Sequence, residues 1–88
     1  MRLSEDFICR TICGETLLMP VGEKTKIYNG IFTLSETGAF IINAIINGAD
    51  EQRTAAELAA EFEISENTAL QDTHEFIEEL MKYGILVQ

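Results

Sequence analysis

Only a few side chains in this sequence belong to types that commonly bind metals or act as nucleophiles. Cys9 and Cys13 lie near the start, and His74 is the only histidine. Residues 7–13, FICRTIC, alternate like a β-strand, which would separate the two cysteine Cα atoms by roughly 13 Å, whereas a disulfide requires less than about 7 Å. A metal site would need further ligands, and His74 stands in no H-x-x-x-H or C-x-x-C motif. We therefore expect reduced, structural cysteines and neither a metal nor a cofactor.

The acidic residues near the C-terminus supply carboxylates but no catalytic arrangement. Asp72, Glu75, Glu78 and Glu79 fall on one predicted helix, where they would be spread along a solvated face. A catalytic carboxylate pair needs a pocket that separates the two pKa values. The sequence also contains no serine–histidine nucleophile motif, Gly-rich phosphate loop or H-E-x-x-H motif. It therefore predicts a protein that is not an enzyme.

Charge is distributed unevenly along the chain. Residues 1–49 hold five acidic and four basic side chains, whereas residues 50–88 hold ten acidic side chains against Arg53 and Lys82, a net charge of −8. Such a surface repels nucleic acid, whose binding depends on Lys and Arg that displace counterions. No apolar run reaches the roughly 18 residues of a membrane span, and acidic residues stand where a secretory signal would be apolar. We expect a cytoplasmic protein that binds neither nucleic acid nor membrane.

The first third of the chain has the patterns of a β-sheet. In FICRTIC, Ile8, Arg10 and Ile12 would lie on one face of a strand, and Phe7 with every second residue after it would lie on the other. Gly14-Glu15 suits a type II′ turn that pairs this strand with TLLMP (16–20), whose proline should mark the end or edge of the second strand. In TKIYNGIFTL (25–34), Asn29-Gly30 suits either a hairpin turn or the start of a single third strand. Residues 31–34 are the favoured strand.

The rest of the chain has the 3.6-residue period of helices. SETGAFIINAIING (35–48) predicts a deeply buried central helix with Ser35 as N-cap and Gly48 past its end. A second helix should begin at Thr54, where Thr54 and Glu57 suit a capping box, with an inner face of Leu58, Ala59 and Phe62. A third helix of about 18 residues should follow a turn at 64–65 and end before residue 84. Its inner stripe comprises Ala69, Leu70, Thr73, Phe76, Ile77, Leu80 and Met81.

These elements predict a single α+β domain over residues 1–88, a winged-helix-like domain with a three-stranded antiparallel N-terminal sheet followed by three helices. The apolar tail 85–87 should pack back onto the body. A winged-helix DNA-binding transcriptional regulator is the alternative function that this fold suggests. Against it, the third helix offers only Asn67, Gln71 and Lys82 to read base edges, amid five acidic residues.

Three segments, taken in order, resemble one protein family. They are VGEKTKIYNGIFTLSETGAFI (21–41), TAAELAAEFEISE (54–66) and DTHEFIEELMKYGIL (72–86). Together they are similar to the PqqD-like proteins, also called RiPP recognition elements. Asp72, Phe76, Leu80 and Gly84 match the family's Asp-x-x-x-Phe-x-x-x-Leu-x-x-x-Gly ending. Ser35 stands where the family commonly has Asn, a change that keeps the capping ability.

The resemblance implies a protein that binds the leader segment of a ribosomally made precursor peptide. It would present this leader to a separate peptide-modifying enzyme, often a radical S-adenosylmethionine enzyme. The leader would add as a strand to the third strand and lie in a groove walled by the third helix, since an edge strand offers unpaired N–H and C=O groups. Carried over by position, the peptide-binding residues would be Ile31, Phe32, Thr33 and Leu34 on the strand and Leu70, Thr73, His74, Ile77 and Met81 on the helix. A generic protein-interaction domain is a third possibility.

Overall fold

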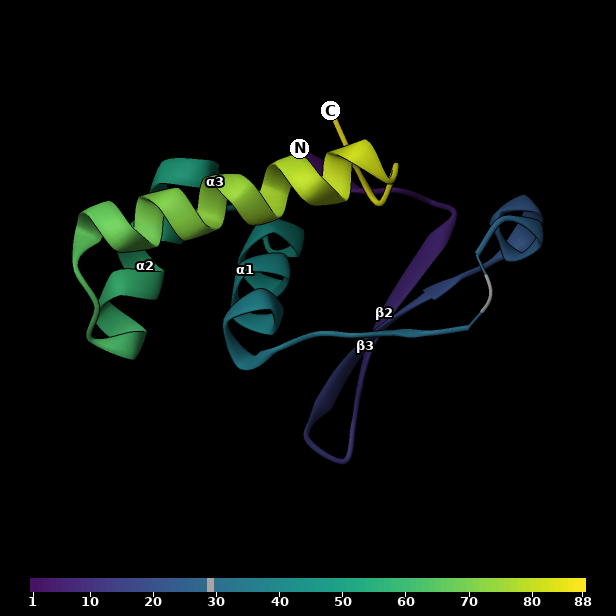
Figure 1. The fold of residues 1–88 in the computed structure, drawn as a ribbon, viewed down its shortest axis with the longest axis horizontal. Coiled ribbons are helices and arrows are strands. Elements are labelled where there is room, and N and C mark those ends of the chain that lie inside the picture. Colours follow the sequence, from purple (N-terminus) through teal and green to yellow (C-terminus); the bar gives the residue numbers. More distant parts are fainter. Residues whose placement is uncertain (29) are drawn as a thin grey trace.

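The computed structural model describes residues 1–28 and 30–88, with most strands preceding the helices (Figure 1). The strands are β1 (Arg2–Leu3), β2 (Phe7–Ile12), β3 (Glu15–Pro20), β4 (Phe32–Thr33) and β5 (Leu86–Val87). The helices are the 3₁₀ helix η1 (Gly22–Lys26) and the α-helices α1 (Glu36–Ile46), α2 (Glu51–Phe62) and α3 (Glu66–Lys82). The predicted α+β class, with a three-stranded antiparallel sheet followed by three helices, is confirmed. Its winged-helix character stays a prediction.

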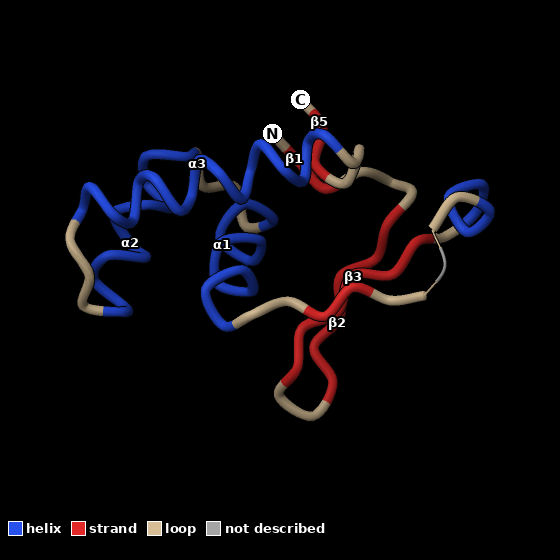
Figure 2. Tube along the Cα trace, in the orientation of Figure 1, coloured by secondary structure: helices blue, strands red, loops and turns tan. Residues whose placement is uncertain are grey.

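The β2–β3 hairpin and the three α-helices occupy opposite sides of the molecule, and the two chain ends lie together (Figure 2). The ends meet because β1 pairs antiparallel with β5, and the Ser4 N–H donates to the Ile85 carbonyl oxygen at 2.8 Å. The predicted packing of the tail onto the body is therefore confirmed. Its pairing with the N-terminus was not predicted.

The β2–β3 hairpin turns one residue earlier than predicted. Ile12 pairs with Glu15, so the two loop residues are Cys13 and Gly14. Both have a positive φ, 52° at Cys13 and 80° at Gly14, as a type I′ turn requires. The prediction of a type II′ turn at Gly14-Glu15 was wrong because the glycine occupies the second loop position, not the first. The predicted end of the second strand at Pro20 is confirmed.

The third strand of the sheet is shorter than predicted. β4 pairs with β3 through Leu17↔Thr33 and Leu18↔Phe32. The Leu34 N–H donates to the Thr16 carbonyl oxygen at 2.9 Å, which extends the pairing by one residue. The segment before it contains η1 instead of a strand. The question of a turn at Asn29-Gly30 lies outside the described residues.

Helix starts are set by capping residues, of which the sequence predicted Ser35. Ser35 caps α1, its Oγ accepting from the Gly38 N–H at 3.1 Å, and Ser65 caps α3 in the same way. The start of α2 was predicted wrongly. Asp50 caps this helix by accepting from the Arg53 N–H at 2.8 Å, and Asp is as good an N-cap as Ser or Thr. Thr54 therefore lies inside α2 and forms no capping box.

One cluster of buried side chains joins the sheet to the helices. From the sheet it takes Phe7 of β2, and α1 contributes Ile41, Ile42 and Ile45 as the central helix that was predicted. Two side chains predicted to be buried are each 44% exposed, Ile46 on α1 and Leu70 on α3. Each lies at the margin of a wide apolar stripe, part of which the neighbouring helices leave uncovered. None of the helices in the described ranges has the length and apolarity needed to cross a membrane.

Candidate functional site

A hollow of about 440 Å³ lies between β4 and the C-terminal half of α3, and we call it the β4–α3 groove. Four of its ten lining residues are aromatic, and one carries a charge. Phe76, Glu79 and Leu80 come from α3 and Tyr83 from its C-cap, and their spacing places them on one face of the helix. The other lining residues are Leu18, Tyr28, Phe32, Thr33, Leu34 and Ile85. The groove is therefore an apolar, aromatic surface with a single carboxylate.

Tyr28 holds the aromatic side chains of the groove together. Its ring centroid lies 5.8 Å from that of Phe7, 5.7 Å from that of Phe32 and 6.4 Å from that of Tyr83. These separations are typical of favourable tilted and edge-to-face aromatic pairs. The Tyr28 hydroxyl also donates to the Tyr83 carbonyl oxygen at 2.9 Å. This bond ties the segment that precedes β4 to the end of α3.

The edge of β4 away from β3 is available for a further strand. In the sheet order β2-β3-β4, β4 is an outer strand. Because the Leu34 N–H points to β3, and N–H direction alternates along a strand, the Phe32 N–H also points to β3. The Thr33 N–H and C=O therefore point away from the sheet, on the side where the strand borders the groove.

The structure brings the predicted strand residues to the groove, with one exception. Phe32, Thr33 and Leu34 line it. Ile31 is exposed and borders a different hollow, beside Met19.

The predicted helical residues lie on other faces of α3. Thr73 is fully buried, and Ile77 belongs to the core cluster. His74 and Met81 line a separate hollow, and Leu70 lies beside α2. The groove thus does not contain this part of the predicted set. The predicted helical residues lie on the face of α3 that packs into the core or on the face turned away from β4. The residues of α3 that face β4 are displaced from them by one to three positions in the sequence.

The groove contains seven residues that the predicted set omitted: Leu18, Tyr28, Phe76, Glu79, Leu80, Tyr83 and Ile85. One signal for them was present in the sequence. The family ending that runs from Asp72 to Gly84 includes Phe76 and Leu80, both of which line the groove. Nothing in the local pattern pointed to Tyr28, because its hydrogen bond and two of its three aromatic contacts are with residues far along the chain.

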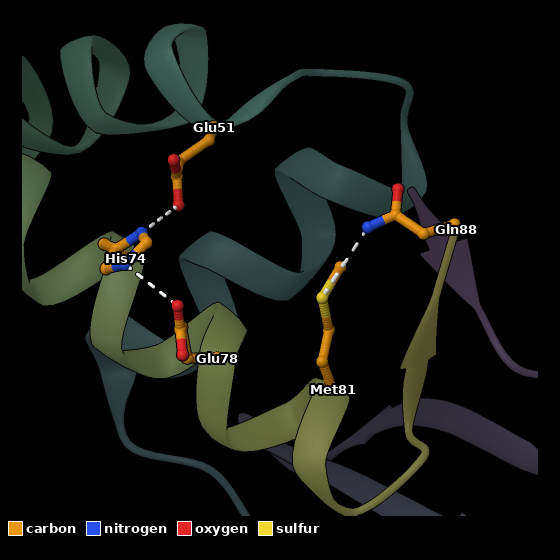
Figure 3. A network of polar contacts seen from close by, with 5 residues as sticks. All are labelled: Glu51, His74, Glu78, Met81 and Gln88. Atoms are coloured by element: carbon orange, nitrogen blue, oxygen red, sulfur yellow. Dashed lines mark hydrogen bonds and ion pairs between the residues drawn. The ribbon is translucent and has the colours of Figure 1, made fainter.

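His74 lies between two carboxylates (Figure 3), and it is not among the residues that line the groove. Its Nδ1 is 2.9 Å from Glu51 Oε1 on α2, and its Nε2 is 3.1 Å from Glu78 Oε1. The pKa of His74 is raised above its ordinary value, mainly by the hydrogen bond to Glu51 and the negative charge of Glu51. The charge and hydrogen bond of Glu78 add to this effect. With both ring nitrogens donating, the protonated imidazolium clamps α2 to α3.

The cysteines and acidic residues form no metal-binding arrangement in the described part of the chain. Cys13 is exposed in the hairpin turn, and Cys9 is half-buried in β2, where burial raises the pKa of its thiol.

The sequence model of one protein family, coenzyme PQQ synthesis protein D (PqqD), matches residues 15–86. That span includes every residue that lines the groove. The chain belongs to the PqqD family. A comparison with curated proteins finds no match to this PqqD-family chain.

Two solved structures resemble this PqqD-family chain over nearly its whole length. One is TbiB1 in complex with the TbiA(beta) leader peptide, and the other is lasso peptide synthetase B1 complexed with the leader peptide. Each has a TM-score of 0.83 and 20% sequence identity to this chain. The alignments cover 98% and 99% of this chain and 94% and 96% of those chains. The likeness shows that the PqqD-family chain shares their fold.

Proposed function

We propose that this chain is a non-catalytic module that binds the leader segment of a ribosomally synthesised precursor peptide and presents it to a separate modifying enzyme. The observation that carries the proposal is the outward-facing backbone of Thr33 beside the β4–α3 groove. Two proteins of the same fold are complexes with leader peptides, which supports it. Membership of the PqqD family supports it as well.

In this proposal a peptide strand pairs with β4. Its backbone bonds to the Thr33 N–H and C=O, which supplies affinity for an extended peptide of any sequence. Alternate side chains of that strand point to the same side, so every second one enters the groove. The aromatic rings of Tyr28, Phe32 and Tyr83 would contact those side chains. The modifying enzyme, such as a radical S-adenosylmethionine enzyme, would supply the chemistry.

No observation favours the DNA-binding alternative. α3 would be the recognition helix of such a protein, and it carries five acidic residues against Lys82. A helix of this charge is repelled by phosphates.

Proline substitutions in β4 test the proposal, because the two positions differ in where the N–H points. Thr33→Pro removes the outward N–H and leaves the bonds between β3 and β4 intact. We expect it to remain folded, as measured by circular dichroism, and to lose peptide affinity by about tenfold or more. The probe is a peptide selected on the parent protein from a phage-displayed library of random peptides.

Two further variants complete the experiment. Thr33→Val changes the side chain but keeps the N–H, so it should retain much more of the peptide affinity than Thr33→Pro does. Phe32→Pro removes an N–H that points to β3, so it should lower stability as well as binding. If a folded Thr33→Pro variant retains the affinity of the parent for all selected peptides, strand addition at this edge is wrong.

A further inference from the structure

The β4–α3 groove combines aromatic ring faces with one negative charge. Phe32 and Tyr83 are 36% and 42% exposed, and Tyr28 lies between their rings. Glu79 is the single charged residue of the lining. Among the residues that the structure describes, Glu79 takes part in no ion pair. Its charge is thus available to a bound molecule.

Aromatic faces beside a carboxylate are a binding site for a cation. The negative face of a Tyr or Phe ring attracts a Lys or Arg head group within about 6 Å, and this attraction adds to the apolar contact of the aliphatic stem. Glu79 can then accept a charge-assisted hydrogen bond from the same head group. An apolar side chain would use the rings but leave the carboxylate without a partner, and an acidic one would be repelled.

The charge of the whole molecule also favours a positively charged peptide. The net charge is −9, and residues 50–88, which include the helical wall of the groove, carry −8 of it. A field of this sign draws positively charged peptides to the surface and raises their association rate. The field and the groove thus favour the same class of peptide.

We infer that the groove selects leader peptides that carry a lysine or arginine at the position that enters it, an inference that rests on the proposed function. The stem of this residue lies over Tyr28, Phe32 and Tyr83, and its head group faces Glu79. Glu79 is therefore a residue that determines specificity, not only part of the wall.

Selection from a phage-displayed random-peptide library tests this inference on the intact chain. The parent, Thr33→Pro, Glu79→Gln and Glu78→Gln proteins are used in parallel. Glu78→Gln is the matched control, because it removes the same charge from the next residue, whose carboxylate contacts His74 on another face of α3. Peptides bound by the parent but not by Thr33→Pro should share a basic residue at one position. That preference should disappear with Glu79→Gln and persist with Glu78→Gln.

A single selected peptide then shows how much the basic side chain contributes to affinity. Where the shared basic residue is Arg, it is first exchanged for Lys. Replacing this Lys with norleucine keeps the aliphatic stem and removes the charge. We expect affinity to fall about tenfold on the parent and much less on Glu79→Gln. Peptides that depend on Thr33 but show no basic preference, or one that Glu79→Gln does not change, overturn this inference and leave the proposed function standing. If no peptide depends on Thr33, the proposed function itself fails, and this inference fails with it.

Discussion

The ring of Phe76 lies directly on the backbone of Gly38. A Cβ atom added to Gly38 would be 3.0 Å from Phe76 Cε1 and 3.3 Å from Cζ, closer than ordinary van der Waals contact. The absence of a side chain in the first turn of α1 therefore lets α3 bring Phe76 to its place in the groove wall. Packing of this kind links the start of one helix to the shape of a site formed by another.

Gly38→Ala should reduce peptide binding more than it reduces stability. Alanine favours the helix by up to about 1 kcal/mol over glycine, which offsets part of the clash, but the Phe76 ring must move. We expect a several-fold loss of affinity for a library-selected peptide, measured by titration calorimetry. In a Phe76→Leu background the same substitution should leave the remaining affinity unchanged. An equal loss in both backgrounds would show that Phe76 does not transmit the effect.

Two buried threonine hydroxyls are expected to lower the stability of the fold. Thr54 and Thr73 are fully buried, and their Oγ1 atoms have no hydrogen-bond partner among the described residues. Valine has nearly the same shape without the polar group, and a buried unsatisfied group costs about 1–3 kcal/mol. Thr73→Val and Thr54→Val should therefore each raise the free energy of unfolding by about 1 kcal/mol in urea titrations. A decrease would mean that these hydroxyls bond to carbonyls of the preceding helical turn in solution.

The type I′ turn at Cys13-Gly14 can be improved by substitution. Cys13 has a φ of 52°, a conformation that costs an ordinary L-residue about 1–2 kcal/mol and that Asn tolerates better than other residues except glycine. Cys13→Asn should thus raise the free energy of unfolding by about 0.5–1 kcal/mol, and Cys13→Val, which is β-branched, should lower it. Both are measured by chemical denaturation under reducing conditions. Equal stabilities for the two variants would contradict the turn assignment.

The His74 clamp should make the stability of the α2–α3 contact depend on pH. Because hydrogen bonding to Glu51 raises the pKa of His74 in the folded protein, the clamp contributes fully below the ordinary value of about 6.5. This contribution is lost as the pH rises through the folded pKa. The difference in Tm between the parent and His74→Gln should therefore be larger in mildly acidic than in alkaline buffer. Glu51→Gln should return the pKa of His74, followed by NMR, toward its ordinary value, and no change would refute the clamp.

Much of the local structure was predictable because it depends on neighbours in the chain. The alternation in FICRTIC identified β2, and Ser35 and Gly48 bounded α1. The errors occurred where two local solutions compete. Asp50 and Thr54 are both good N-caps four residues apart, and only the path of the chain after α1 favoured the first. In the hairpin, the register that puts Gly14 at the second loop position prevailed over the one that puts it at the first.

The sequence by itself determined the order of the three sheet strands and the three α-helices, the acidic helical half and, through the PqqD pattern, the family. These features follow from residue types and from spacings within one element. Only the tertiary structure decided which face of α3 meets β4, that the groove contains Phe76, Glu79 and Tyr83, and that Thr33 points its backbone outward. The apolar stripe of α3 is wide enough for either of its margins to face β4. Which margin does so depends on contacts between distant segments. Of these, the bond from the Tyr28 hydroxyl to the Tyr83 carbonyl joins positions 55 residues apart.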